Sequence, residues 1–211
     1  MKFLSILALV LAAGTAQAAT ITASSTAPAP GTRIELRAQD FAASGRCGSG
    51  GSVVAGGCSV ALVSGGRPAA YDRFAPLGGD WIDSQDLADV TWTLSQPRAF
   101  TQLTFALTDA FDQLPDRKLG ASRFALTVEG AVWTIPRRQA SGTLHWLTVT
   151  FDRPTTTASL HFATRRNDGW GLSSASVLPA TLPAIPLPAG GWLLPAALGM
   201  LGLVARRRRR A

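Results

Sequence analysis

Short runs in which apolar and polar residues alternate recur through the middle of the chain, and such alternation predicts β-strands. The runs lie at residues 34–38, 90–94, 101–107, 124–128, 131–135, 144–151, 159–163 and 172–177. The dipeptide Glu129-Gly130 separates two of them and is typical of a two-residue hairpin turn. No long helical stripe appears among these runs, and we expect only a single helical turn near residues 84–88.

The faces of these runs indicate how the strands pack. Leu103, Phe105 and Leu107 share one face of their run, as alternate residues of a strand do. Strands of this length, separated by turn signals, predict an all-β fold, an antiparallel β-sandwich that is jelly-roll-like. We assign this domain to residues 20–177 and a Pro/Ala-rich linker to residues 178–184.

The N-terminus has the pattern of a secretory signal peptide at residues 1–18. Lys2 supplies the positive charge, and residues 3–13 form an apolar stretch of about 11 residues, too short to cross a bilayer. Ala16-Gln17-Ala18 is an A-x-A cleavage site, so we expect cleavage after Ala18, with Ala19 as the next choice.

The C-terminus, residues 185–211, combines three features in a fixed order. A short motif comes first, formed by Ile185, Pro186, Leu187, Pro188 and Ala189. Residues 189–205 carry no charge, and about 17 residues is the lower limit for a transmembrane helix. The positive residues that follow would stay cytoplasmic and hold the body outside; they are Arg206, Arg207, Arg208, Arg209 and Arg210.

This tail resembles the VPLPA-CTERM sorting signal, a relative of the PEP-CTERM signals of Gram-negative bacteria, with Ile185 in place of the usual valine. The resemblance implies processing by an exosortase-type membrane protease and delivery from the inner membrane to the cell surface or extracellular matrix. Segments 81–86, 107–112, 142–146 and 166–171 also look like parts of the bodies of other VPLPA-CTERM surface proteins. The resemblance to these proteins implies no catalytic residues.

The charge of the chain resides mainly at its ends. The formal net charge is +7, but without Lys2 and the terminal arginines 14 basic residues face 13 acidic ones. A body so close to neutral excludes nucleic acid as a partner. Charged residues make up only 16% of the chain, and 21 glycines and 13 prolines favour a loop-rich β protein.

Cys47 and Cys58 are the only cysteines and flank a glycine-rich segment. In an exported chain, a pair at this spacing indicates a disulfide. The alternative is a metal pair, but zinc requires about four ligands and no local histidine completes the set.

Aspartates recur in the segments between the predicted strands, and calcium prefers carboxylate and carbonyl oxygens in loops. The candidate calcium ligands are Asp83, Asp109, Asp112 and Asp168. The alternative is that these aspartates cap turns and solvate loops. No EF-hand spacing occurs, so a calcium site would have to be assembled from distant loops.

The aromatic residues open a second candidate function. Trp92 and Trp146 lie at strand positions consistent with a core, whereas Trp81 and Trp170 lie in Gly/Asp-rich, loop-like settings. We therefore take Trp81 and Trp170 as the ligand-facing candidates of a carbohydrate-binding module, with an extracellular polysaccharide as the partner.

Catalytic patterns are weak. No G-x-S-x-G nucleophile elbow occurs, and His145 and His161 each lie beside apolar neighbours with no serine marked out to complete a triad. The expected function is that of a non-enzymatic surface or matrix protein. Carbohydrate binding and a histidine-dependent hydrolase are the alternatives.

Overall fold

A computed structural model describes residues 18–44, 59–64, 76–114, 123–164 and 168–181. The chain divides into two compact units, Met1–Ala180 and Thr181–Ala211, and the described strands all lie in the first. They form one antiparallel sheet of ten strands, and the only helix among the described residues is a 3₁₀ turn, η1 (Ala38–Asp40). The prediction of an all-β, antiparallel fold is confirmed.

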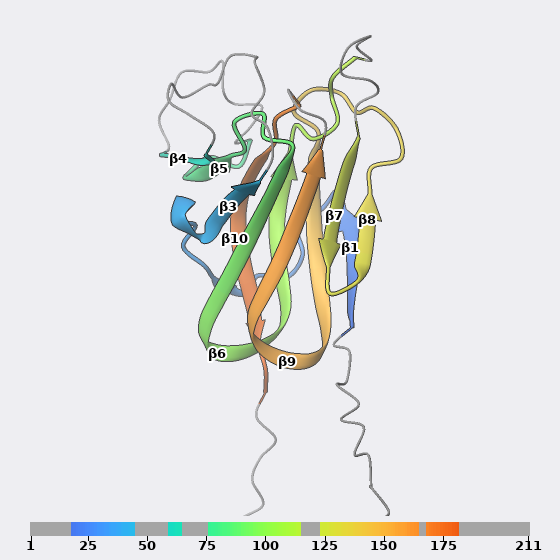
Figure 1. The fold of residues 1–211 in the computed structure, drawn as a ribbon. Helices are drawn as coiled ribbons and strands as arrows, with labels where there is room; N and C mark the ends of the chain where they lie inside the picture. The colour runs from blue at the N-terminus through green and yellow to red at the C-terminus, as the bar shows by residue number, and fades with distance from the viewer. Residues whose placement is uncertain (1–17, 45–58, 65–75, 115–122, 165–167, 182–211) are drawn as a thin grey trace, which may run out of the picture. The chain divides into compact units, whose positions relative to one another are not determined.

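Two long strands organise the sheet (Figure 1). Strands β6 (Asp89–Thr108) and β9 (Leu144–Thr164) pair along most of their length and bend together. The ladder is irregular between Ser95 and Phe100, where Pro97 lies, and Pro154 lies in the facing part of β9. Proline lacks an N–H group and cannot donate to the ladder, which favours a bend at this point. We call this the bend end, and the opposite end, where β5 ends and β10 begins, the open end.

The bend divides each long strand into two arms. The first arm of β6 pairs with the second arm of β9 in one layer, and the second arm of β6 pairs with the first arm of β9 in the other layer. In one layer β3 (Phe41–Ser44) pairs with the first arm of β6, while β7 (Phe124–Val128) and β8 (Ala131–Thr134) extend from the second arm of β9. The other layer runs from β4 (Ala61–Val63) through β5 (Trp81–Asp83) and β10 (Gly171–Pro179) to the second arm of β6 and the first arm of β9. Strands β1 (Ala19–Ser24) and β2 (Thr32–Arg33) flank β9 and β10.

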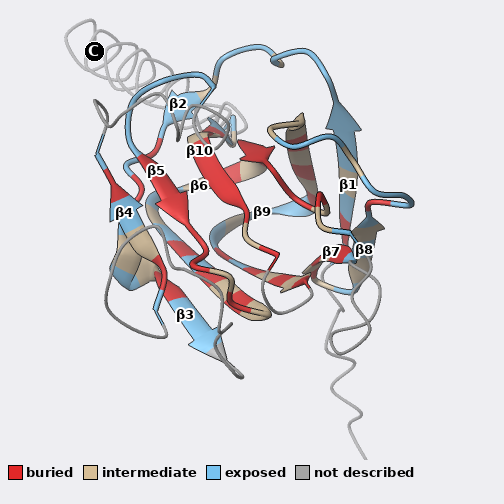
Figure 2. Cartoon of the chain, turned by 90° about the horizontal axis from the view of Figure 1, so that it is seen from above, coloured by how far each residue is buried: buried red, intermediate tan, exposed pale blue. Residues whose placement is uncertain are grey.

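The core lies between the two layers, where buried residues alternate with more exposed ones along the strands (Figure 2). Trp92 stacks on Phe41 in its own layer, with ring centroids 5.3 Å apart. The same indole meets Phe105 of the other layer edge to face at 5.7 Å, so β6 packs against itself across the bend. Phe105 in turn contacts Phe162, at 6.0 Å.

Several local predictions can be compared with the structure. The hairpin at Glu129-Gly130 is confirmed, with φ of 46° and 84° at the two turn residues. The predicted strand at residues 34–38 is wrong, because the strand there is limited to Thr32–Arg33, although Ile34 and Leu36 are buried as expected. The expected helical turn at residues 84–88 is also wrong, because Gln85 and Asp86 adopt left-handed φ values of 54° and 58°.

Other predictions concern the ends and the cysteines. Residues 1–17, Cys47, Cys58, the motif at 185–189 and the arginines at 206–210 lie outside the described residues. Within the described residues no helix has the length and apolar character needed to cross a membrane, and the predicted span at 189–205 is not among them.

Candidate functional site

The predicted calcium ligands all lie at the open end. Asp83 ends β5 opposite Gly171, Gly171 faces Thr108 of β6, and Asp109 follows directly. All four carboxylate residues, Asp83, Asp109, Asp112 and Asp168, are buried. Pairing between strands therefore brings residues that are distant in sequence to one end of the fold, as a site built from loops requires.

Asp83 holds the turn that joins β5 to β6. Its carboxylate accepts the backbone N–H of Gln85 at 2.9 Å and the side-chain amide of Gln85 at 2.8 Å. Burial raises the pKa of Asp83 from its ordinary value of 3.8 to about 6, an effect that these hydrogen bonds oppose and the nearby Asp86 reinforces. The carboxylate thus serves the left-handed turn at Gln85 and Asp86.

Asp109 holds a second connection at the same end. It adopts a φ of 60°, and its carboxylate accepts the Ser141 hydroxyl at 3.0 Å and the Gly142 N–H at 2.6 Å. Nearby, the Asp112 carbonyl accepts the Arg138 Nε–H at 2.6 Å. These contacts tie the end of β6 to the segment that leads into β9.

Asp168 belongs to the turn that precedes β10. Its carbonyl accepts the Thr164 hydroxyl at 3.3 Å. The next two residues, Gly169 and Trp170, contact the β5–β6 turn. The backbone N–H of Trp170 donates to Ser84 Oγ at 2.8 Å. A Cβ added at Gly169 would lie 2.8 Å from a carboxylate oxygen of Asp86. The two turns are therefore in close contact.

These contacts bear directly on the calcium hypothesis. Among the described residues, no group of three or more histidine, cysteine, aspartate or glutamate side chains is arranged to hold a metal ion. The carboxylates of Asp83 and Asp109 instead accept hydrogen bonds from the protein itself. The arrangement favours the alternative considered from the sequence, in which these aspartates stabilise turns.

The prediction that Trp81 and Trp170 face a ligand is wrong for both rings. Trp81 lies within β5, between β4 and β10, and is only 3% exposed. Trp170 is fully buried, and its ring lies 4.7 Å from that of Phe162. Their Gly- and Asp-rich flanks suggest loops in the sequence, but strand pairing and core packing enclose both rings.

The two histidines lie on different arms of β9 and so in different layers. His145 pairs with Leu107, and its ring meets Trp133 at 5.6 Å, where burial lowers the pKa of the imidazole. His161 lies on the second arm, with Nε2 3.5 Å from Asp89 Oδ1. The structure therefore does not join them into one acid–base pair.

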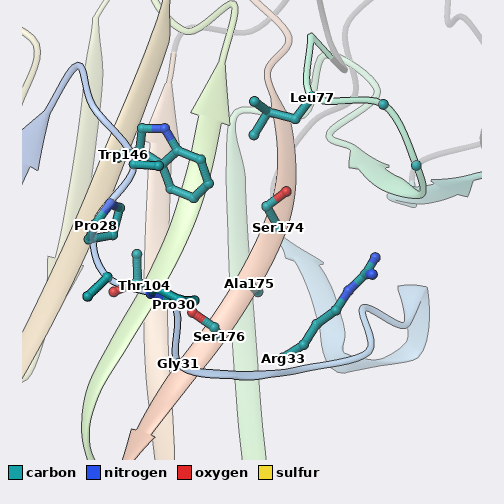
Figure 3. Close-up of a pocket in the computed structure, with 14 residues that line it drawn as sticks. Pro28, Pro30, Gly31, Arg33, Leu77, Thr104, Trp146, Ser174, Ala175 and Ser176 are labelled. Carbon is teal, nitrogen blue, oxygen red and sulfur yellow. The ribbon is translucent and has the colours of Figure 1, made fainter.

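A groove crosses the outer surface of the layer that contains β10, and the ring that lines it is Trp146 (Figure 3). It has a volume of about 460 Å³. One wall is residues 27–31, which we call the strap, and another is the turn at residues 77–79. The floor is formed by side chains of β6, β9 and β10: Thr104, Trp146, Ser174, Ala175 and Ser176.

The groove has a defined local cause. One extra residue in β10 shifts its pairing with β6 between Ser173 and Ser176, and Ser174 at this bulge has a φ of 51°. The strap is pressed against β10 at Gly31, where an added Cβ would lie 2.5 Å from the Val177 carbonyl oxygen. In Figure 3 Trp146 and Leu77 stand on opposite sides of the groove, with Ser174 between them.

Trp146 was assigned to the core from sequence, and the structure corrects that assignment. The residue is half-buried, while Leu147 and Val149 beside it are fully buried. The signal was present in the alternation, because Trp146 shares its face of the strand with Thr148. A ring on the polar face of a strand is a better candidate for ligand contact than a ring between glycines and aspartates.

Comparison with known proteins finds no matching family model, no similar curated protein and no similar solved structure.

Proposed function

We propose that this chain is an exported, non-enzymatic surface protein, tethered by a C-terminal helix in the inner membrane and facing the periplasm. An exosortase-type protease then processes it for the cell surface or the extracellular matrix. The observation that carries the proposal is the arrangement of the ends. A short apolar stretch with an A-x-A site precedes the first strand, and a motif, an apolar run and an arginine cluster follow the last.

The first strand fits the proposed signal-peptide cleavage. Strand β1 begins at Ala19, which pairs with Phe151 of β9. Cleavage after Ala18 removes the signal peptide and leaves every paired residue of β1 in place. It also exchanges the Ala18 carbonyl, which accepts the Asp152 N–H at 3.1 Å, for a new amino terminus at Ala19.

The described strands also fit a tethered domain. The start of β1 pairs with Phe151 and the end of β10 pairs with Phe100, and these two rings lie 5.5 Å apart at the bend end. The chain therefore enters and leaves the sheet at one end.

The finer fold class belongs to this proposal. We infer that the two layers form a jelly-roll-like β-sandwich. We also infer that Cys47 and Cys58 form a disulfide in the oxidising periplasm, which closes the glycine-rich segment between them. The carboxylates of Asp83 and Asp109 accept hydrogen bonds from turn residues, which supports a body without catalytic residues. The ligand-binding alternative retains support from the Trp146 groove alone.

The test is expression in a Gram-negative host with and without an exosortase-type protease, followed by fractionation and intact mass measurement. We expect a mature N-terminus at Ala19, oxidised thiols, and loss of the arginine tail only where the protease is present. Substitution of Pro186 and Pro188 by alanine should retain the tail in the inner membrane. Pro183→Ala, a linker proline outside the motif, is the matched control and should be processed normally.

Two results would refute the proposal. One is a cytosolic chain that begins at Met1 with both thiols reduced. The other is a tail removed equally in the Pro186/Pro188 variant and in the control, because processing would then not depend on the motif.

A further inference from the structure

Trp146 presents its indole to the groove, beside Pro28 of the strap (Figure 3). The residue is half-buried, and among the described residues no aromatic side chain packs against its indole. It lines the groove between the strap and the 77–79 turn. An open indole in a concave site is suited to a ligand with one apolar face.

Hydroxyl groups line the same groove. Ser174 and Ser176 line the groove from β10, and Thr104 lines it from β6, where its hydroxyl is 3.3 Å from that of Thr148. Ser174 reaches its position through the bulge and its left-handed backbone, a conformation that disfavours residues other than glycine. Bulges and strained residues of this kind are concentrated at functional sites, where they aim a side chain.

Arg33 gives the groove its charge. Among the described residues that line the groove it is the only ionisable one, and it is exposed. No hydrogen bond or ion pair joins its guanidinium to another described residue, whereas the neighbouring Arg37 is paired with Glu35 at 2.8 Å. Arg33 and Ser174 also line an adjoining hollow of about 340 Å³, which is lined as well by Asp80 and by Glu35, the ion-pair partner of Arg37.

These features together fit one class of ligand. A sugar ring has an apolar C–H face that stacks on an indole and a rim of hydroxyls that bond to serine and threonine. A carboxylate on the sugar matches the planar fork of a guanidinium. A lipid chain would leave the serines and Arg33 without partners, and a nucleic acid would require many more cations.

We propose that the groove binds an acidic polysaccharide, with the indole of Trp146 stacking on a sugar ring and Arg33 contacting a uronate carboxylate. The proposal deepens the proposed function by naming a ligand class for the body, and it rests on that function only for access to extracellular polysaccharide. Binding by purified protein and export in cells are separate measurements, so either can fail without the other.

The experiment is titration calorimetry of the full-length chain, purified in a neutral detergent, with tetragalacturonate and with its fully methyl-esterified form. The ester has the same backbone without the charge. We expect measurable binding of the acid, with a dissociation constant below about 10 mM, and weaker binding of the ester. Salt should weaken binding of the acid more than binding of the ester.

Variants test each contact separately. Trp146→Ala should weaken binding of both ligands by about tenfold, and Trp146→Phe should recover part of the loss. Arg33→Gln should weaken binding of the acid by about threefold and leave the ester unchanged. Arg137→Gln removes an exposed arginine that does not line the groove and is the matched control. The unfolding temperature of each variant reports whether it is folded.

The outcomes decide the proposal. Loss of affinity in folded Trp146→Ala with a charge-specific loss in Arg33→Gln supports it. No heat from either ligand at about 10 mM, or unchanged affinity in Trp146→Ala, overturns it. Equal binding of acid and ester, with no effect of Arg33→Gln, overturns the assignment of an acidic ligand.

Discussion

Replacement of Asp83 by asparagine should make the protein more stable at pH 8 and hardly change its stability at pH 4. Asp83 is buried at the end of β5 and accepts two hydrogen bonds from Gln85. Asparagine has nearly the same shape and keeps an acceptor for the Gln85 N–H. The Gln85 amide can turn to accept from the new side-chain N–H₂.

The magnitude follows from the raised pKa. Burial raises the pKa of Asp83 from 3.8 to about 6, so the folded protein holds this proton more tightly than the unfolded chain does. Between those two values the folded state binds more protons, and stability therefore falls as pH rises. Ionisation of the buried carboxyl costs about 3 kcal/mol once the pH exceeds the folded pKa.

The assay is urea unfolding, followed by tryptophan emission, of the full-length chain in neutral detergent at several pH values from 4 to 8. The difference between variant and wild type should be only about 0.5 kcal/mol at pH 4 and should grow to about 3 kcal/mol by pH 8. For a urea slope of about 2 kcal/mol per molar, the midpoint at pH 8 rises by about 1.5 M. The control is Glu35→Gln, which removes an exposed carboxylate outside the β5–β6 turn.

The control should keep the pH dependence of the wild type. A difference for Asp83→Asn that stays constant with pH would refute the reasoning, because it would show that the charge of the carboxylate carries no penalty in the folded state. A variant less stable at pH 8 than at pH 4, relative to wild type, would show that the hydrogen bonds to Gln85 outweigh burial.

Four further substitutions test the packing and the turns by the same unfolding measurement. Trp92→Ala removes a ring that contacts Phe41 and Phe105 and should cost about 4 kcal/mol; a cost below about 1 kcal/mol would contradict contact between the layers. Gly31→Ala places a Cβ 2.5 Å from a backbone oxygen and should cost about 2 kcal/mol, whereas an unchanged midpoint would mean that the strap is free to move. Glu129→Asn places a residue suited to a φ of 46° in the hairpin turn and should stabilise by about 0.5 kcal/mol, with Gly130→Ala, at a φ of 84°, destabilising as its counterpart.

Local patterns in the sequence predicted the strands and their faces well. Val90 and Leu103 are buried as the alternation requires, and the Glu129-Gly130 turn joins the strands that it was expected to join. These features depend on neighbours in the chain, so a single sequence contains them. The path of β6 through Pro97 did not follow, because a bend and a loop have the same local composition and differ only in what pairs beside them.

The candidate site was harder to predict because it depends on contacts between distant segments. Trp170 is buried by Phe162 and Phe124, and neither partner can be inferred from the Gly/Asp-rich turn around it. Asp109, Asp112 and Asp168 lie in connecting segments as expected, whereas Asp83 is the last residue of β5. Which hydrogen bonds their carboxylates accept depends on the turns that meet them. The position of Trp146 on the polar face of its strand could be predicted from the alternation in the sequence. The strap that forms a groove beside it could not.

Strands β6 and β9, which the two layers share, determine how the protein unfolds. Because β6 and β9 each run through both layers, neither layer can detach while the other keeps its hydrogen bonds. A break in one arm propagates along the same backbone into the second. The described strands should therefore unfold as one cooperative unit, in an all-or-none transition without a half-sheet intermediate.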